Sequence, residues 1–206
     1  MSKGKYIVIE GLDGSGKTTQ AENLARYFGD KTIAVREPGG TAMSENIRTL
    51  LKDKTIPRAP QTNLFLFSAA RADLIETIVR PAVESGTNVV SDRCWVSTMA
   101  YQHAEGVDAG HIEQLSQLAT KEFYEPDLLI FLDVEPALCR KRLSARGGAE
   151  ADFFDLKGED YFNRVRSAYQ NHVKNHINCI TVDGSGTPEA VWEVLQKELE
   201  TRGEMS

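Results

Sequence analysis

One glycine-rich segment carries residues of the types and spacing that phosphate chemistry needs. Residues 11–18 satisfy G-x-x-x-x-G-K-[ST] without a mismatch, directly after a β-branched run and before a segment with helical spacing. Backbone N–H groups in such a loop converge on phosphate oxygens, the lysine brings a mobile cation, and the threonine hydroxyl can ligate Mg²⁺. We therefore expect a nucleoside triphosphate to bind at Gly11, Leu12, Asp13, Gly14, Ser15, Gly16, Lys17 and Thr18.

A phosphate loop alone is compatible with a switch GTPase, a motor-type ATPase or a small-molecule kinase. A switch GTPase normally carries an Asn-Lys-x-Asp motif that reads guanine, and this tetrapeptide does not occur in the sequence. A large ATPase would need more chain than 206 residues. The sequence thus favours a kinase that holds two phosphorylated ligands.

Three further segments stand at the ends of expected strands or on an expected helix. Residues 36–41 read Arg-Glu-Pro-Gly-Gly-Thr, residues 67–71 read Phe-Ser-Ala-Ala-Arg, and residues 92–102 read Asp-Arg-Cys-Trp-Val-Ser-Thr-Met-Ala-Tyr-Gln. Together with the phosphate loop and the Pro-Asp-Leu-x-x-x-Leu-Asp pattern of residues 126–133, they make the chain resemble the thymidylate kinases. Enzymes of that family move the γ-phosphate of ATP onto dTMP, and the resemblance spans residues 5 to about 146.

The resemblance implies a role for several side chains at the acceptor nucleotide. Phe67 would stack on the thymine ring, and Arg71, one helical turn further on, would donate to a thymine carbonyl. Arg93 would clamp the acceptor phosphate with its two-pronged guanidinium. The same resemblance implies that Arg48 is a second phosphate clamp and that the hydroxyls of Ser97 and Thr98 line the base or sugar pocket. It also implies that the ring of Tyr101 excludes a ribose 2′-hydroxyl.

The residue types leave plainer alternatives open for two of these side chains. Phe67 could be a core phenylalanine, which is the role we expect for Phe65. Arg71 could form a surface ion pair with Asp73 or Glu76, because both carboxylates lie near it along the chain.

Metal binding is implied at Thr18 and at Asp92, whose carboxylate would organise Mg²⁺ or its waters. A purely structural pair between Asp92 and the neighbouring arginine is the alternative. Asp13 and Glu37 would hold the sugar 3′-hydroxyl or waters of the metal. Cys94 is expected to serve packing, because phosphoryl transfer of this kind needs no covalent nucleophile.

A cationic stretch near residue 142 indicates the lid that closes over ATP in kinases of this shape, at about residues 142–158. Solvated cations at a helix C-terminus would give the same pattern. Many bacterial relatives carry Asp-Arg-x-Glu in the lid, whereas residues 152–155 here read Asp-Phe-Phe-Asp, and Ser15 supplies no arginine either. The transition-state cation is therefore expected from Arg146, Arg142 or Lys157.

Short apolar runs alternate with helical periodicity along the chain. Strands are expected at residues 5–10, 32–36, 87–91, 128–134 and 179–182, and helices at 18–28, 44–51, 61–84, 109–122, 136–146, 160–173 and 188–200. Pro81 should kink or break the third helix, Gly86 should close it, and Leu118 should face inward. The alternation predicts an α/β fold with a parallel sheet covered on both faces, which binds ligands at the carboxyl ends of its strands.

The resemblance implies a P-loop NTPase fold, with a doubly wound five-stranded parallel sheet, as a single domain over residues 1–206. It also implies ATP and Mg²⁺ as cofactors, phosphorylation of dTMP to dTDP, and a homodimer. Two alternatives remain at this point. One is a kinase for a related deoxynucleoside monophosphate such as dUMP, and the other is a regulator that binds nucleotides without turnover.

Composition narrows the partners and the compartment. The chain has 24 Lys and Arg against 30 Asp and Glu, a net charge of −6, which argues against a nucleic-acid coat. No apolar stretch approaches the ~20 residues of a membrane span, and the first apolar run is too short for a signal peptide. Three widely spaced cysteines form no disulfide or metal pattern. We expect a cytoplasmic protein without nucleic-acid or membrane partners.

Overall fold

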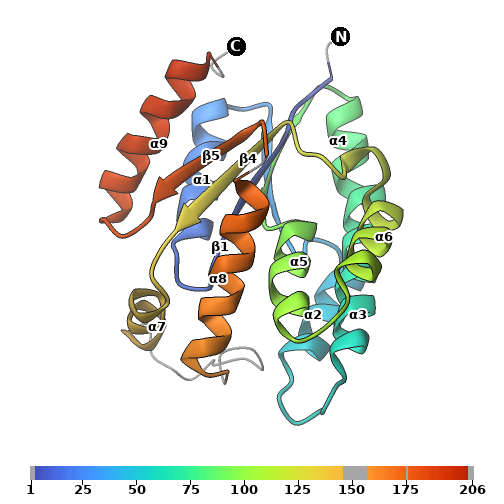
Figure 1. Ribbon diagram of the computed structural model, residues 1–206. Coiled ribbons are helices and arrows are strands. Elements are labelled where there is room, and N and C mark those ends of the chain that lie inside the picture. Colours follow the sequence, from blue (N-terminus) through green and yellow to red (C-terminus); the bar gives the residue numbers. More distant parts are fainter. Residues whose placement is uncertain (1–2, 146–156, 175, 204–206) are drawn as a thin grey trace.

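The parallel sheet is present as expected. The structure is a computed structural model that describes residues 3–145, 157–174 and 176–203. In this part of the chain five strands form one sheet, in the order β2-β3-β1-β4-β5 with every neighbouring pair parallel (Figure 1). The strands are β1 Tyr6–Gly11, β2 Thr32–Arg36, β3 Asn88–Asp92, β4 Leu128–Asp133 and β5 Cys179–Asp183.

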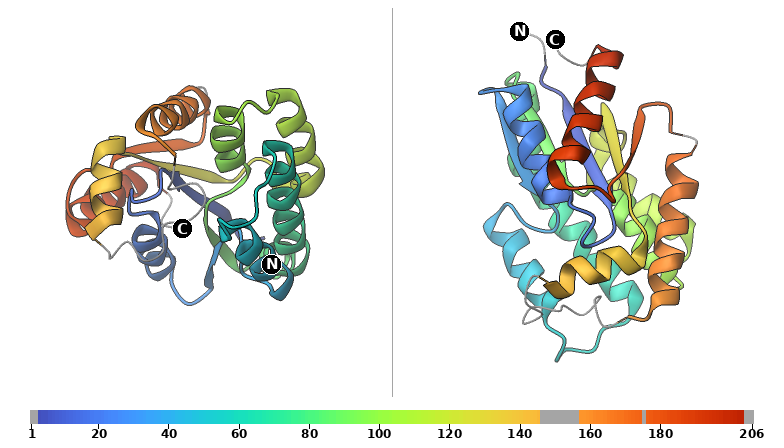
Figure 2. Two further views of the ribbon diagram at one scale, coloured as in Figure 1. Left: turned by 90° about the horizontal axis from the view of Figure 1, so that it is seen from below. Right: turned by 90° about the vertical axis from the view of Figure 1, so that its left-hand side faces the viewer.

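Helices connect the strands and cover both faces of the sheet. α1 packs against β1, β2, β3 and α9 on one face, whereas α5 and α8 pack against each other and against β1 and β4 on the other (Figures 1 and 2). The helices are α1 Lys17–Phe28, α2 Ala42–Lys52, α3 Pro60–Leu74, α4 Arg80–Glu84, α5 Trp95–Ala104, α6 Ala109–Thr120, α7 Pro136–Ala145, α8 Glu159–Val173 and α9 Pro188–Arg202.

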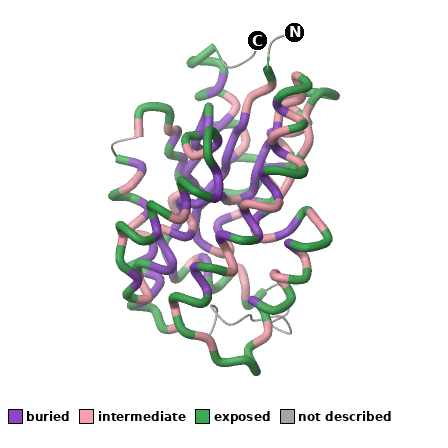
Figure 3. The backbone as a smooth tube through the Cα atoms, turned by 90° about the vertical axis from the view of Figure 1, so that its right-hand side faces the viewer, coloured by how far each residue is buried: buried purple, intermediate pink, exposed green. Residues whose placement is uncertain are grey.

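Alternation along β1 explains why the sheet divides the core in two. Tyr6 and Val8 belong to the cluster beneath α5 and α8, whereas Ile7 and Ile9 belong to the cluster beneath α1 and α9. Since successive strand residues point to opposite faces, a continuous apolar run is what a doubly covered strand requires. Burial is accordingly concentrated in the strands at the centre of the molecule (Figure 3).

The long helix expected over residues 61–84 changes its winding just before Pro81 and does not break at the proline itself. α3 runs into a π-helical segment, Ile75–Val79, and α4 then continues the chain with Pro81 in its first turn. Proline lacks an N–H and its ring crowds the carbonyl one turn earlier, so the wider turn lies on its N-terminal side. Gly86 closes the helix at φ +85°, as predicted.

Two expectations need correction, and one helix was not predicted. Phe65 is 54% exposed and Leu118 is 72% exposed, so neither packs in the core. On α3 the inward face is set by Leu64 and Ser68, and Phe65 points away from it. α5 was not predicted, because Trp95–Ala104 mixes buried apolar and buried polar residues and shows little helical amphipathicity.

The described ranges contain no candidate for a membrane-spanning helix. No helix there combines the length and the apolar composition that a membrane crossing requires.

Candidate active site

The phosphate loop connects β1 to α1 at the carboxyl edge of the sheet. Gly14 and Gly16 have φ angles of +85° and +99°, which L-residues with side chains rarely adopt. A Cβ atom on Gly14 would also lie 2.5 Å from the carbonyl oxygen of Cys139, because the loop packs closely on α7. The glycines therefore give the loop its conformation, while Leu12 is buried and contributes to the core.

Lys17 stands in the first turn of α1 and is held by the loop itself. Its ammonium Nζ donates a hydrogen bond to the carbonyl oxygen of Leu12 at 2.8 Å, and only 6% of the residue is exposed. Burial lowers the pKa of Lys17, and the nearby Arg93 guanidinium lowers it further, although carboxylates beginning with Asp13 act in the opposite direction. The site thus holds a desolvated cation in the place where a phosphate would arrive.

Thr18 and Asp92 come together from different elements. The Thr18 hydroxyl donates to Oδ2 of Asp92 at 2.6 Å, joining the start of α1 to the end of β3. Among the described residues no cluster of three or more His, Cys, Asp or Glu side chains forms a metal cage. A hydroxyl and one carboxylate nevertheless fit Mg²⁺, which usually takes one or two carboxylates and completes its shell with water and phosphate.

Asp13 and Arg93 form an ion pair beside the loop, with Nη2 of Arg93 2.7 Å from Oδ1 of Asp13. The Tyr101 hydroxyl donates to Oδ2 of Asp13 at 3.1 Å and lies 3.2 Å from its backbone nitrogen. Burial opposes ionisation of Asp13, but the charges of Arg93 and Lys17 prevail and hold its pKa well below the usual range. These contacts attach a carboxylate of the phosphate loop to a guanidinium that follows β3.

Arg71 is buried, so the alternative of a surface ion pair is wrong. Its Nε donates to Oε2 of Glu37 at 2.6 Å, and its Nη2 donates to the Thr98 hydroxyl at 3.0 Å and to the carbonyl of Cys94 at 3.1 Å. The side chains of Arg71 and Glu37 are 2% and 4% exposed. Burial raises the pKa of Glu37, an effect that the Arg71 charge opposes. Nη1 of Arg71 has no hydrogen-bond partner among the described residues.

The buried thiol fits the packing role expected for Cys94. The residue is 2% exposed, and burial raises the pKa of its thiol well above the ordinary value, so a reactive thiolate is disfavoured. Its sulfur accepts a hydrogen bond from the backbone nitrogen of Val96 at 3.4 Å at the start of α5.

One cavity of about 290 Å³ gathers most of the side chains that the sequence singled out. Phe67 lines it from α3, and Arg48 lines it from α2 while donating to the carbonyl of Pro38 at 2.8 Å. The other expected residues on its wall are Asp13, Gly14, Gly16, Lys17, Thr18, Glu37, Arg71, Asp92, Arg93, Ser97, Thr98 and Tyr101.

A second cavity, of about 90 Å³, lies on the other side of the phosphate loop. Ser15 and Arg142 line it, and Arg142 donates to the carbonyls of Gly184, Ser185 and Gly186 at 2.8–2.9 Å. The guanidinium is therefore committed to the loop after β5.

Lys157, the other described candidate for the lid cation, does not line the larger cavity. Lys157 forms an ion pair with Glu105 at the end of α5, with Nζ 3.3 Å from Oε1. Arg146 and Phe153 lie outside the described residues.

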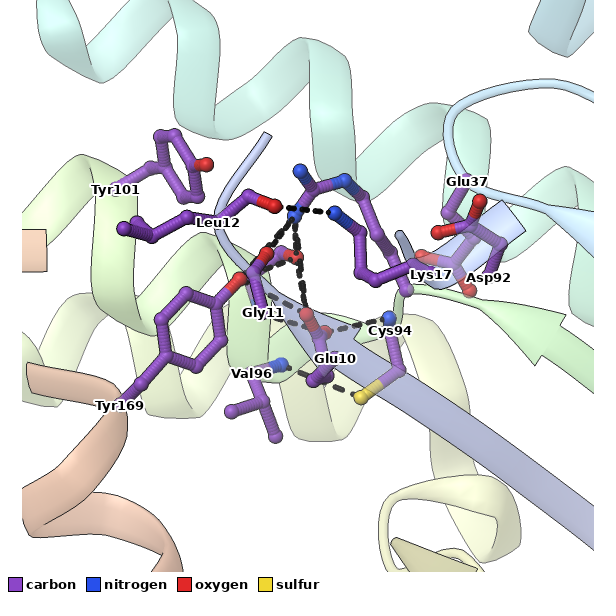
Figure 4. Close-up of polar contacts among 12 residues, drawn as sticks. Glu10, Gly11, Leu12, Lys17, Glu37, Asp92, Cys94, Val96, Tyr101 and Tyr169 are labelled. Carbon is purple, nitrogen blue, oxygen red and sulfur yellow. Dashed lines mark hydrogen bonds and ion pairs between the residues drawn. The ribbon is translucent and has the colours of Figure 1, made fainter. Parts of the chain in front are cut away.

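Sequence reasoning missed three buried polar residues at this site. Gln102 is 1% exposed, lines the larger cavity and leaves its Nε2 without a partner in the described part of the chain. Glu10 and Tyr169 are fully buried, and the Tyr169 hydroxyl donates to Oε2 of Glu10 at 2.8 Å (Figure 4). A glutamate inside an otherwise apolar strand was the available signal for Glu10, whereas the position of Tyr169 follows only from the fold.

Sequence comparison relates this chain to thymidylate kinases. A family model described as thymidylate kinase matches residues 9–194. A thymidylate kinase of Chlorobium chlorochromatii is 34% identical over 210 residues, covering 95% of this chain and 94% of that one. A thymidylate kinase of Nitrosomonas eutropha is 38% identical over 206 residues, covering 97% and 94%.

The solved structures give the same result. The crystal structure of thymidylate kinase from Ehrlichia chaffeensis superposes with a TM-score of 0.76 at 28% identity and covers 96% of this chain and 99% of that one. The phosphate loop, Arg71, Arg93 and the cavity that they line thus occur in a chain that resembles these proteins over nearly its whole length. The chain belongs to the thymidylate kinase family.

Proposed function

We propose that this protein transfers the γ-phosphoryl group of ATP to the phosphate of dTMP, which yields dTDP and ADP. The observation that carries the proposal is the larger cavity, into which the phosphate loop, Asp92, the Asp13–Arg93 pair and the Arg71–Glu37 pair all open. An acceptor phosphate at Arg93 would stand beside Lys17, as an in-line transfer requires. Mg²⁺ held by Thr18 and Asp92 would neutralise charge on the donor phosphates.

The wall opposite the phosphate loop offers the chemistry of a pyrimidine pocket. Phe67 supplies a flat apolar face, and Nη1 of Arg71 and Nε2 of Gln102 are buried donors without partners among the described residues. Because a buried donor without a partner is costly, base carbonyl oxygens are the natural complement. Asp13 can accept from the sugar 3′-hydroxyl, and the ring of Tyr101 restricts space for a 2′-hydroxyl.

A steady-state assay of ADP release with ATP and each of dTMP, dUMP, dCMP and dGMP tests this function. The expected result is turnover with dTMP at the highest kcat/KM. Preference for dUMP would assign the enzyme to the related monophosphate, because one methyl group contributes only ~1–3 kcal/mol of discrimination. Binding of both nucleotides without ADP release would indicate a regulator.

Phe67→Ala should raise the KM for dTMP about tenfold or more while leaving that for ATP near the parent value. Stacking of a base on an aromatic ring contributes roughly 1–3 kcal/mol. Phe67 lines the larger cavity but not the smaller one beside Arg142, and it also packs partly against the core. Parallel changes in both KM values, or loss of the folded state in a thermal melt, would return Phe67 to the core. Val194→Ala, at an exposed apolar position on α9, is the control.

Arg142→Ala should weaken ATP without a large loss of kcat. Arg142 donates to the carbonyls of Gly184 and Gly186 and so holds their loop in place. Arg142 and both glycines line the smaller cavity beside the phosphate loop. We propose that the adenine half of ATP uses this cavity. The measurement is the KM for ATP at saturating dTMP, with Arg140→Ala, two residues earlier on α7 and exposed, as the control. A collapse of kcat at unchanged KM would instead make Arg142 the transition-state cation.

We propose that Arg146 supplies the transition-state cation, because Arg142 donates to backbone carbonyl groups and Lys157 pairs with Glu105.

We also propose that the protein is a homodimer in the cytoplasm. The exposed Phe65 on α3 supports association through that helix, and sedimentation of the purified chain tests it.

A further inference from the structure

A buried carboxylate lies directly behind the proposed phosphate clamp. Oε1 of Glu10 accepts from the backbone nitrogens of Cys94 and Ser97 at 2.9 and 3.0 Å. Oε2 accepts from the Ser97 hydroxyl at 2.7 Å and from the Tyr169 hydroxyl at 2.8 Å. Four donors thus fill the four lone-pair directions of one carboxylate whose exposed fraction is zero. Figure 4 shows these contacts converging on Glu10.

The two hydroxyls that donate to Glu10 also accept from Arg93. Nη1 of Arg93 donates to the Ser97 hydroxyl at 2.7 Å and to the Tyr169 hydroxyl at 3.2 Å. The same nitrogen lies 3.7 Å from Oε2 of Glu10, so the carboxylate reaches the guanidinium through the two hydroxyls. Hydrogen bonds that run from a cation through hydroxyls to an anion reinforce one another in a low-dielectric interior.

The backbone at Arg93 makes such support necessary. Its φ angle is +84°, a left-handed conformation that a residue with a side chain adopts only when its surroundings impose it. The carboxylate fixes the residue that follows, because it accepts from the nitrogens of Cys94 and Ser97 at the start of α5. The main chain and the side chain of Arg93 are therefore both tied to Glu10.

Tyr169 brings a distant part of the chain into this arrangement. It stands on α8, 159 residues from Glu10, and its ring is stacked on Phe131 of β4 with centroids 5.4 Å apart. A ring packed in this way cannot turn aside, so its hydroxyl occupies one place. The hydroxyl contacts Glu10, Ser97 and Arg93 and lines neither described cavity.

We propose that Tyr169 and Glu10 are positioning residues, which hold Arg93 at the angle needed to clamp the phosphate of the acceptor nucleotide. The proposal rests on the function proposed above. Neither residue touches a ligand, and both act through the guanidinium. Asp13 holds the Nη2 side of that guanidinium, and the Tyr169–Glu10 pair holds the Nη1 side.

Tyr169→Phe is the sharpest test, because it removes one oxygen atom and keeps the stacked ring. We expect kcat/KM for dTMP to fall about tenfold, while the KM for ATP stays within twofold of the parent value. Glu10→Gln, which keeps the shape but removes the charge, should act in the same direction. Tyr124→Phe is the matched control: its ring stacks on Trp95, its hydroxyl is not among the donors to Glu10, and it should behave like the parent.

A double-mutant cycle separates positioning from general loss of packing. In an Arg93→Lys background, Tyr169→Phe should change kcat/KM for dTMP by less than twofold, because the oriented fork is already absent. Additive losses, an equal rise in the KM for ATP, or a Tyr169→Phe enzyme with parent kinetics would overturn the proposal. Thermal melts of each variant exclude unfolding as the cause.

A substrate-free measurement keeps the two proposals distinguishable. Nitrogen NMR of the guanidinium reports rotation about the Nε–Cζ bond of Arg93, which the hydrogen bonds at Nη1 should slow in the parent and Tyr169→Phe should accelerate. Equal rotation in the parent and in Tyr169→Phe contradicts positioning even if dTMP is turned over. Parent protein that releases no ADP with dTMP contradicts the proposed function, and the rotation rates still decide the role of Tyr169.

Discussion

Lys17→Ala should reduce kcat at saturating ATP and dTMP by about 10³-fold. In the transition state, charge is spread over the transferred phosphoryl oxygens, and a preorganised cation in a desolvated site stabilises that charge by several kcal/mol. Lys17 meets both conditions, since it is 6% exposed and is held on the carbonyl of Leu12 at the mouth of the cavity. Rapid-quench measurement of ADP formation gives the chemical step directly.

The control for this result is Lys31→Ala, which removes an exposed lysine ahead of β2 and should leave turnover unchanged. A thermal melt of Lys17→Ala should show a folded protein, because its ammonium group makes its hydrogen bond within the loop. A loss of kcat smaller than tenfold in folded Lys17→Ala would remove the lysine from the transition state.

Arg71→Met should lower the free energy of unfolding by about 3–5 kcal/mol at neutral pH. The methionine matches much of the side-chain volume, but the substitution leaves Glu37 as a buried carboxylate without its cation. Removing one partner of a buried ion pair lowers the free energy of unfolding by about this amount. Chemical denaturation followed by fluorescence measures the change. A deficit below 1 kcal/mol would mean that water reaches Glu37 in the folded protein.

The deficit of Arg71→Met should also depend on pH in a predictable direction. Burial already raises the pKa of Glu37, and loss of the Arg71 charge raises it further. The folded state then binds a proton more readily than the unfolded state, so the variant gains stability relative to the parent as the pH falls toward the ordinary glutamate value of 4.5. Above the folded pKa the deficit is constant and largest.

The double variant Arg71→Met/Glu37→Gln provides the matched comparison. Glutamine cannot ionise, so most of the stability should return and the pH dependence should vanish. A double variant that is as unstable as Arg71→Met, with the same pH profile, would assign the effect to packing around residue 71 and not to the charge of Glu37.

Much of the site could be predicted because its chemistry is local in sequence. The phosphate loop is eight consecutive residues, and Asp92 and Arg93 follow a strand whose end had to reach the same edge of the sheet. Phe67 and Arg71 are one helical turn apart, so their shared face could be predicted from spacing alone.

The parts that escaped prediction depend on contacts between distant segments. Arg71 finds Glu37 34 residues away, although Asp73 and Glu76 were the nearer carboxylates along the chain. Glu10 stood out only as a charged residue after an apolar run, and nothing in the sequence pairs it with Tyr169 on α8. Exposure of Phe65 and Leu118 was missed because apolar residues on helices indicate a core until the packing partners are known.

The π-helical segment Ile75–Val79 has a consequence for how this chain can tolerate changes in length. The π-helical turn holds one residue more than a regular α-helical turn does. Because of this extra residue, Arg71 before the segment and Val83 after it both face the interior. Deleting one residue in the segment would restore a regular helix but rotate one half against the other by about 100°. Either Arg71 or Val83 would then turn toward solvent. Shortened variants of this helix should therefore be rare among functional sequences.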